Sequence, residues 1–375
     1  MNKKIYITSL HLKHGGIEMA ITLLANALAK RGYEVEILNT YHLGEPAYEL
    51  DPRVNITYLT NVYPNRKEIK EAFQKRKFFR FIKEGFYAIK VLYLKKKTMK
   101  KKIESIREGT IIATRNEHAV LLSKYGNSTV KKIAQLHHDH QFEKGILKDF
   151  RKNYTNIDIF VVLTELLKRE IEEIMLNNNH TKVMVIPNFL SLTEKPAKEK
   201  REKQIVAVGR LHEVKGFLRL LEIWKDTNVD QKIVLKIIGD GEQGEIIRKK
   251  IENLGIENRV ILTGAMEHCE VLEEMKKSLI YVMTSYTEAF PYVLLEAMAA
   301  GLPVIAYDVR VGPRAIISNG EDGYLVQDGN QEEYIQKIKS LINNNELWEK
   351  MSESARKTAG KFSEDEVIKL WTNIL

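Results

Sequence analysis

The chain has 375 residues, 44% of them hydrophobic, so it is long enough for two domains with their own cores. Cys269 is the only cysteine, which excludes an intrachain disulfide and favours a reducing compartment. The formal net charge is +9, and the first apolar run ends at His11, too early for a signal sequence or a membrane span. We therefore expect a cytoplasmic protein.

The N-terminal segment has the order strand, loop, helix, strand. Residues 4–10 alternate like a strand, residues 19–30 have helical periodicity, and residues 33–39 predict the next strand. The first loop contains Gly15 and Gly16, and glycines there let a ligand approach the backbone. They do not follow the pattern Gly-x-Gly-x-x-Gly, which disfavours a nicotinamide or flavin cofactor. This order is typical of a doubly wound α/β domain.

Positive charge is concentrated in residues 66–107, which contain 16 Lys or Arg and four Glu. Within this segment, residues 78–94 predict a helix with an aromatic, apolar side and a basic side, and further lysines follow. Residues 78–102 could dock on an anionic membrane surface, or the apolar side could pack on the domain's own sheet. The basic excess favours docking, and the charges exclude a spanning helix.

Further short strands are predicted at residues 110–114, 132–136, 158–163 and 183–186. His118 follows the first of them and His137 the second, and the carboxyl ends of parallel strands are where such sheets bind ligands. We expect one histidine to face a ligand, while an ordinary structural role stays open for either. A metal site at residues 137–140 is disfavoured, because neighbouring side chains point to opposite sides and no matching Cys/His pair exists.

Residues 188–203 predict a linker, after which the strand, loop and helix pattern restarts. The next strand, residues 204–208, is followed by Arg210 and Lys215, just before a helix at residues 217–225. Two cations and free helix amides can hold a diphosphate, although solvated surface cations are the simpler alternative. Later strands are predicted at residues 232–238, 259–263, 279–283 and 302–307. Residues 320–329 are rich in turn residues, and a last helix, residues 363–375, follows a break at Gly360.

Two carboxylates stand out between residues 283 and 308. Pro291 is expected at the first position of a helix that ends near Ala300, and Glu296 is the one charged residue inside it. A carboxylate on such an apolar helix is costly unless it is paired, and it lies ~8 Å beyond the anion-binding helix start. That distance matches the separation of a nucleotide's diphosphate from its ribose, and Glu288 in the preceding loop could bind an attached sugar. Alternatively, Glu288 complements the helix dipole and Glu296 pairs with an unseen Lys or Arg.

The frame Glu-Ala-Phe-Pro, four residues, Glu-Ala-Met-Ala-Ala-Gly-Leu-Pro-Val resembles the signature of retaining glycosyltransferases of family 4. The loop Gly-Arg-Leu-His-Glu-Val-Lys-Gly is similar to that family's Gly-Arg-Leu-x-x-x-Lys-Gly pattern. The resemblance implies an α/β fold of two Rossmann-like doubly wound domains facing a central cleft, called GT-B. It assigns residues 1–187 to the acceptor side and residues 204–360 to the nucleotide-sugar side, with a helix in residues 361–375 crossing back.

The resemblance also implies roles. It assigns the donor to Gly16, Arg210, Lys215, Glu288, Ala289, Phe290, Pro291 and Glu296, and catalysis to Glu288, His137, Arg210 and Lys215. Gly15 and His118 are candidates for the acceptor side. We expect retention of configuration, no metal, and a nucleotide-sugar donor with UDP favoured.

The expected acceptor is a membrane-linked or anionic cell-surface glycan, namely a polysaccharide, a glycolipid or a teichoic acid, met at the inner face of the cell membrane. One rival is a nucleotide-sugar epimerase of the same fold. Another is a basic protein that binds nucleic acid or membrane without catalysis, but the sequence shows no nucleic-acid recognition element beyond its basic segment. We therefore expect no nucleic-acid partner.

Overall fold

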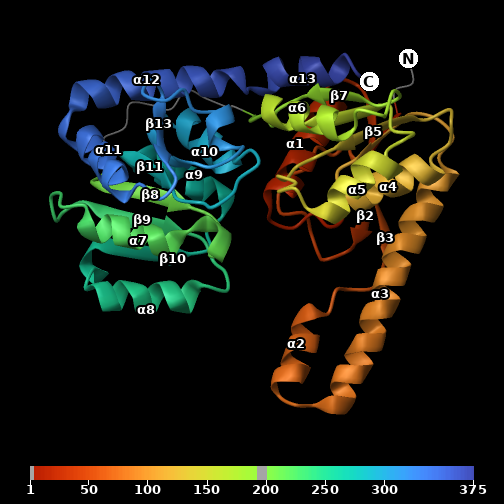
Figure 1. Cartoon of the computed structure of the whole chain (residues 1–375), viewed down its shortest axis with the longest axis horizontal. Helices are drawn as coiled ribbons and strands as arrows, with labels where there is room; N and C mark the ends of the chain where they lie inside the picture. Colours follow the sequence, from red (N-terminus) through yellow and green to blue (C-terminus); the bar gives the residue numbers. More distant parts are fainter. Residues whose placement is uncertain (1–3, 192–200) are drawn as a thin grey trace. The chain divides into compact units, whose positions relative to one another are not determined.

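The computed structural model describes residues 4–191 and 201–375, and the chain forms two compact units (Figure 1). Unit 1 comprises residues 1–186 together with residues 370–375, and unit 2 comprises residues 187–369. Each unit is a parallel β-sheet with helices on its faces. The predicted fold class, two doubly wound α/β units, is confirmed.

Unit 1 contains a seven-stranded sheet in the order β3-β2-β1-β4-β5-β6-β7, with every adjacent pair parallel. Its strands are β1 Lys4–Ser9, β2 Glu34–Tyr41, β3 Asn55–Thr60, β4 Thr110–Ala113, β5 Lys131–Gln135, β6 Ile159–Val162 and β7 Lys182–Val185. Its helices are α1 Gly16–Lys30, α2 Arg66–Gln74, α3 Phe78–Ser105, α4 Asn116–Tyr125, α5 Lys144–Asn153 and α6 Glu165–Ile174. The strand order reverses between β1 and β4, and open α/β sheets bind ligands at the carboxyl ends of strands at such a point.

Unit 2 contains a six-stranded parallel sheet in the order β10-β9-β8-β11-β12-β13. Its strands are β8 Gln204–Val208, β9 Val234–Ile238, β10 Val260–Gly264, β11 Ile280–Met283, β12 Val304–Asp308 and β13 Gly323–Gln327. Its α-helices are α7 Phe217–Asp226, α8 Gly244–Leu254, α9 His268–Lys277, α10 Tyr292–Ala299, α11 Gln331–Asn343 and α12 Asn345–Lys361, and α13 Glu364–Thr372 continues into unit 1. Three short 3-10 helices are η1 Glu213–Lys215, η2 Glu257–Arg259 and η3 Pro313–Ala315. Here the order reverses between β8 and β11.

Several predicted boundaries are wrong. The turn-rich segment 320–329 contains strand β13, whose five residues are flanked by Gly320 and Gly329. Helix α12 runs through Gly360, so the break before the last helix falls at residues 362–363. Pro291 is the N-cap of α10 in extended conformation rather than its first residue, because the helical hydrogen bonds begin with its own carbonyl.

The expected linker lies only partly within the structure, because residues 192–200 are outside the described residues. The residues before them belong to unit 2, where Phe189 and Leu190 are buried. Leu190 N–H donates to Phe362 O, and Glu364 N–H donates to Leu190 O, both at 2.9 Å. These bonds tie the chain that enters unit 2 to the chain that leaves it.

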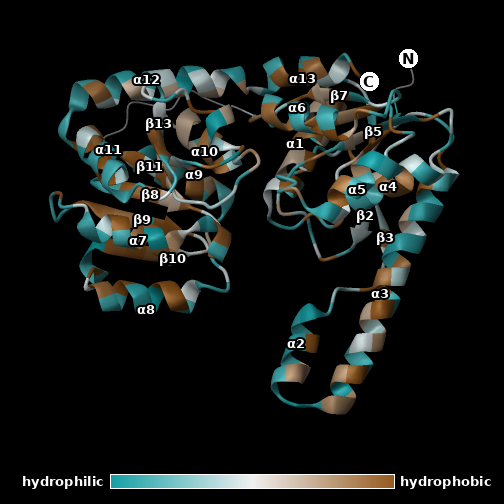
Figure 2. Cartoon of the chain, in the orientation of Figure 1, coloured by the Kyte–Doolittle hydropathy of each residue, from teal (hydrophilic) through white to brown (hydrophobic). Residues whose placement is uncertain are grey.

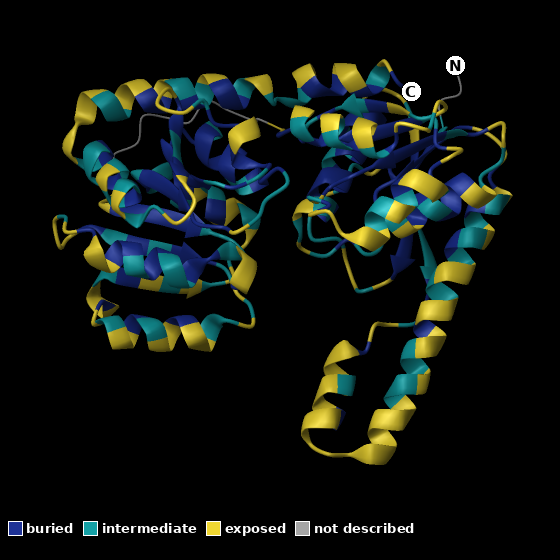
Figure 3. Ribbon diagram, viewed as in Figure 1, coloured by how far each residue is buried: buried dark blue, intermediate teal, exposed yellow. Residues whose placement is uncertain are grey.

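Helices α2 and α3 form a helical hairpin, residues 66–105, that projects from the body of unit 1 (Figure 1). One side of α3 packs inward through Val91, Met99 and Ile103. The alternative that its aromatic side packs on the sheet is wrong, since Phe79 and Phe86 are 87% and 70% exposed (Figure 3). Within the described residues, no helix is long and apolar enough to cross a membrane.

Candidate active site

In unit 2, the predicted diphosphate lysine and the loop carboxylate lie together. Lys215 ends η1 after β8, and Glu288 lies in the loop after β11, so both stand at the switch point of the sheet. The Nζ of Lys215 donates to Oε1 of Glu288 at 2.6 Å, and Ser285 Oγ donates to the same oxygen at 2.7 Å. A cation and a carboxylate that are 73 residues apart in the sequence thus form one polar centre.

Gly216 fixes the two loops of this centre against each other. It has φ +66°, and a Cβ added there would lie 2.1 Å from the carbonyl oxygen of Thr284. Thr284 Oγ1 also donates to Gly216 O at 3.0 Å. Only a residue without a side chain permits this approach, so Gly216 holds Lys215 beside the loop of Glu288.

Arg219 also supports this loop, although no sequence motif singled it out. Its guanidinium donates to the carbonyls of Thr284 and Ser285 at 2.6 Å each, and to Asp328 at 2.6 Å. It also lies over the ring of Tyr286, 3.9 Å from the centroid. Arg219 therefore fixes the backbone that leads to Glu288.

Arg210, the other predicted diphosphate ligand, contacts a different carboxylate. Its Nη2 donates to Glu242 Oε2 at 3.0 Å, on the loop after β9, and His212 Nε2 lies 3.2 Å from the other oxygen of Glu242. The Arg210 side chain is 70% exposed. It is therefore an exposed surface cation that is paired with Glu242.

Glu296 is buried in α10, and its partner is neither a Lys nor an Arg. Nε2 of His268, the first residue of α9, lies 2.7 Å from Oε1 of Glu296. This hydrogen bond raises the pKa of His268. The alternative that Glu296 pairs with an unseen Lys or Arg is wrong, because its partner is a histidine 28 residues earlier. No local sequence signal marks that histidine.

The loop that leads into α10 is packed rather than open. Phe290 and Pro291 are buried, and Phe290 lies edge-on to Phe362 with ring centroids 5.4 Å apart. Gly312 N–H donates to Glu288 O at 2.9 Å, and a Cβ on Gly312 would lie 2.9 Å from that same oxygen. Ala289, between them, is half-buried. These contacts set the direction of the Glu288 side chain.

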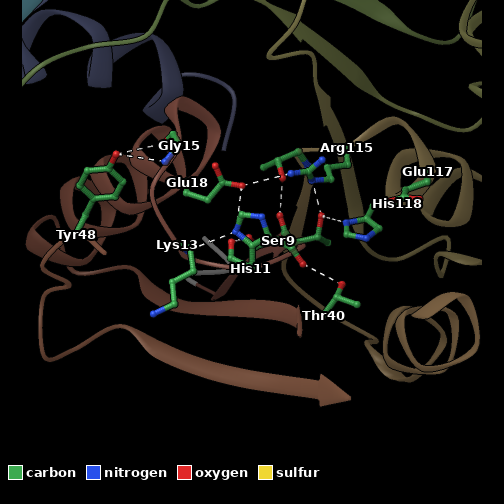
Figure 4. A network of polar contacts seen from close by, with 12 residues as sticks. Ser9, His11, Lys13, Gly15, Glu18, Thr40, Tyr48, Arg115, Glu117 and His118 are labelled. Atoms are coloured by element: carbon green, nitrogen blue, oxygen red, sulfur yellow. Dashed lines mark hydrogen bonds and ion pairs between the residues drawn. The ribbon is translucent and has the colours of Figure 1, made fainter. Parts of the chain in front are cut away.

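In unit 1, the glycine loop encloses a buried carboxylate that sequence reasoning missed (Figure 4). Gly15 is the N-cap of α1, and a Cβ there would lie 2.2 Å from Oε2 of Glu18. Arg115, just after β4, reaches Oε1 of Glu18 at 3.3 Å, and His11 Nδ1 lies 3.6 Å away. Gly15 therefore lies directly against the Glu18 carboxylate, and Gly16 begins the helix beside it. The signal available in the sequence was Glu18 itself, the one acidic residue of a largely apolar helix.

His118 is held inside unit 1. It lies in the first turn of α4, and its Nδ1 is 2.9 Å from Thr8 Oγ1 in β1 (Figure 4). Burial lowers its pKa to about 4, so the ring is neutral near pH 7. Its second ring nitrogen, Nε2, has no partner within the part of the chain that the structure describes.

His137 has two unpaired ring nitrogens. It follows β5 and is buried, yet neither Nδ1 nor Nε2 has a hydrogen-bond partner among residues 4–191 and 201–375. Burial lowers its pKa to about 3. An imidazole buried without partners is costly, which makes His137 a stronger candidate for ligand contact than His118.

Comparison with known proteins shows which family the chain resembles. Residues 190–358 match the family model described as glycosyl transferases group 1. An uncharacterized glycosyltransferase of Haemophilus influenzae is 29% identical over 374 residues, covering 96% of both chains. The chain is therefore similar to the group 1 glycosyltransferases over most of unit 2, and to a glycosyltransferase over nearly its whole length.

Two further similarities extend this assignment. The poly(ribitol-phosphate) alpha-N-acetylglucosaminyltransferase of Staphylococcus aureus is 28% identical to this chain over 248 residues, 64% of this chain and 48% of that protein. The crystal structure of a Staphylococcus aureus TarM mutant in complex with Fondaparinux, alpha-GlcNAc-glycerol and UDP has a TM-score of 0.78 at 17% identity, covering 99% of both chains. At that identity the structural likeness establishes the GT-B fold alone.

Proposed function

We propose that this glycosyltransferase transfers a hexose or N-acetylhexosamine, with retention, from a nucleotide sugar to a membrane-linked or anionic glycan. UDP is the favoured nucleotide, which the UDP in the similar TarM structure supports. The observation that carries the proposal is the centre formed by Lys215, Ser285 and Glu288 at the switch point of unit 2. It offers a cation for a diphosphate beside a carboxylate for a sugar.

The chemistry of the Lys215 side chain suits the leaving group. Its ammonium has three N–H donors, so it can bind a phosphate oxygen while it still donates to Glu288. In Glu288, Oε1 accepts from Lys215 and Ser285, whereas Oε2 has no partner among the described residues. Oε2 is therefore free to accept from hydroxyls of the transferred sugar, and the second carboxylate, Glu296, accepts from the ribose.

Charge stabilisation would drive the reaction. The bond between the sugar carbon and the phosphate oxygen breaks, the acceptor oxygen bonds to that carbon on the same face, and the acceptor proton passes to a donor phosphate oxygen. Lys215, Arg210 and the amides near Phe290 stabilise the negative charge of the leaving diphosphate. These groups neutralise the phosphates without a metal ion. His137 would donate from a neutral ring N–H to a sugar hydroxyl.

The acceptor proposal has two supports. The relative from Staphylococcus aureus is named for transfer to poly(ribitol-phosphate), an anionic polyol phosphate. Residues 66–107 of this chain carry 16 basic and four acidic residues, which favours approach of an anionic acceptor or an anionic membrane. We place the enzyme as a peripheral protein at the inner face of the cell membrane.

The test measures nucleotide binding first and sugar transfer second. UDP, GDP and ADP are each added at about one hundred times the dissociation constant, where a true ligand adds ~2.7 kcal/mol to unfolding free energy. Wild type should be stabilised by one nucleotide, and Glu296→Gln, corrected for its own starting stability, should not. Product analysis with the matching nucleotide sugars and a polyol phosphate acceptor then follows. Stabilisation by none of them would overturn the proposal, and conversion of the donor without an acceptor would indicate the epimerase.

A further inference from the structure

Half of the exposed large hydrophobic side chains of the described chain lie in one short segment. The described chain exposes 18 large hydrophobic side chains, and nine of them fall within residues 73–93 of the helical hairpin. These nine are Phe73, Phe78, Phe79, Phe81, Ile82, Phe86, Ile89, Leu92 and Tyr93. Figure 2 shows hydrophobic residues along the projecting part of α3, and Figure 3 shows the same part as exposed. We call residues 73–93 the apolar end of the hairpin.

Five of these side chains form a continuous stripe. Phe79, Ile82, Phe86, Ile89 and Tyr93 recur at spacings of three and four residues, which places them on one side of α3. The opposite side of α3 packs on α2 and on the rest of unit 1. Rotating the helix to bury the stripe would therefore break that packing. An apolar surface of this kind indicates an interaction site.

The charged residues around the stripe indicate which kind of partner covers it. Lys83 and Lys90 border it on the same side, and between residues 66 and 93 there are nine basic and three acidic residues. Two of the three acids are engaged locally, since Glu71 pairs with Lys75 and Glu84 accepts from Asn65. A second copy of this chain would set lysine against lysine along the contact, which disfavours self-association. Anionic lipid headgroups complement both the lysines and the aromatic stripe.

The lysine run that follows is largely committed to unit 1. Lys95 pairs with Glu117 at 2.6 Å, and Lys102 pairs with Glu36 at 2.8 Å. Lys100 lies over the ring of Tyr125, 3.9 Å from its centroid. These contacts anchor the base of α3 to the domain and leave the apolar end as the part available to a partner.

We propose that the apolar end of the hairpin, residues 73–93, docks on an anionic lipid bilayer and inserts its aromatic stripe among the headgroups. This assigns the contact to the projecting end of residues 66–105 rather than to the whole of residues 78–102. The stripe lies along ~21 Å of helix at 1.5 Å per residue, and an interfacial helix buries its apolar face ~5–10 Å deep. The docking does not depend on the proposed transfer reaction, but it would bring the enzyme to a membrane-linked acceptor.

The test is co-sedimentation of the full chain with vesicles of phosphatidylcholine alone or mixed with phosphatidylglycerol. Wild type should bind the anionic vesicles and release at high salt. The double variant Phe79→Gln/Phe86→Gln, which changes only exposed side chains, should lose at least tenfold in apparent affinity. Lys83→Glu/Lys90→Glu should lose a similar factor. The matched control Lys96→Glu/Lys101→Glu makes the same charge change in the lysine run and should lose less than threefold.

Several results would overturn this assignment. Binding that survives in Phe79→Gln/Phe86→Gln but fails in Lys96→Glu/Lys101→Glu would show adsorption through the lysine run. A wild-type dimer that dissociates in Phe79→Gln/Phe86→Gln, without vesicle binding, would show that a second copy covers the stripe. Absence of vesicle binding would reject the membrane outright. Nucleotide stabilisation, measured on the same variants, reports on unit 2 and separates failure of docking from failure of the proposed function.

Discussion

Replacement of His268 by alanine should destabilise unit 2 in a pH-dependent way. His268 donates to the buried Glu296 at 2.7 Å, and a hydrogen bond to a charged group contributes ~1.5–3 kcal/mol. Because the His268 side chain is 40% exposed, solvent screening places the value at the lower end, ~1.5 kcal/mol. For a unit of this size, ~2–4 °C is lost per kcal/mol, so the melting temperature should fall by ~3–6 °C at pH 5.5.

The pH dependence has a definite sign. The bond to Glu296 raises the pKa of His268, so the folded state holds this proton more tightly than the unfolded chain does. The resulting stability is fully present below the unfolded-state pKa of ~6.5 and is lost as pH rises through the folded-state pKa. The difference between wild type and His268→Ala should therefore shrink by pH 9, where only a neutral hydrogen bond remains.

Thermal unfolding of the full chain at pH 5.5 and pH 9 measures this effect. His180→Ala is the control, because His180 contacts Asp158 at 3.1 Å in an exposed pair that should contribute little. Equal losses at the two pH values for His268→Ala, or no loss at either, would refute a stabilising pair between His268 and Glu296.

Three further predictions concern the same unit. Gly216→Ala should lower the free energy of unfolding by more than ~2 kcal/mol, because the new Cβ meets the Thr284 carbonyl. Gly255→Ala, where φ is +63° and the space is open, should lower it by only ~1–2 kcal/mol. Denaturant titration compares the two variants. Arg219→Lys should lower turnover while the global fold stays unchanged. An ammonium group cannot donate to the two backbone carbonyls and to Asp328 in the fixed geometry of a guanidinium. A rate that matches wild type would reject the positioning role of Arg219. Lys215→Met should lower kcat ~10²–10³-fold with an unchanged circular dichroism spectrum. Lys225→Met, which changes an exposed lysine, should leave kcat unchanged. A wild-type rate for Lys215→Met would remove this residue from the mechanism.

Local patterns were sufficient for most elements of the fold. Strand β8, residues 204–208, and helix α7, residues 217–226, follow from apolar runs bounded by glycine-containing loops. Strand β13 was missed because its five residues lie between turn signals that outweigh so short a run. Helix α3 continues past residue 94 because lysine is a good helix former and because Met99 and Ile103 are buried against unit 1.

From the amino-acid sequence it was therefore possible to predict the two doubly wound units, the resemblance to glycosyltransferases, and the loops in which Lys215 and Glu288 lie. These follow from periodicity and from motifs a few residues long. The tertiary structure alone decided which charges pair: Glu18 with Arg115 across 97 residues, and Glu296 with His268 across 28. Parallel strands bring the ends of distant segments to one edge, so the partner of a buried carboxylate depends on the order of strands in the sheet. The same holds for the hairpin, whose aromatic stripe is amphipathic in sequence but is left uncovered only by the way α2 and α3 pack.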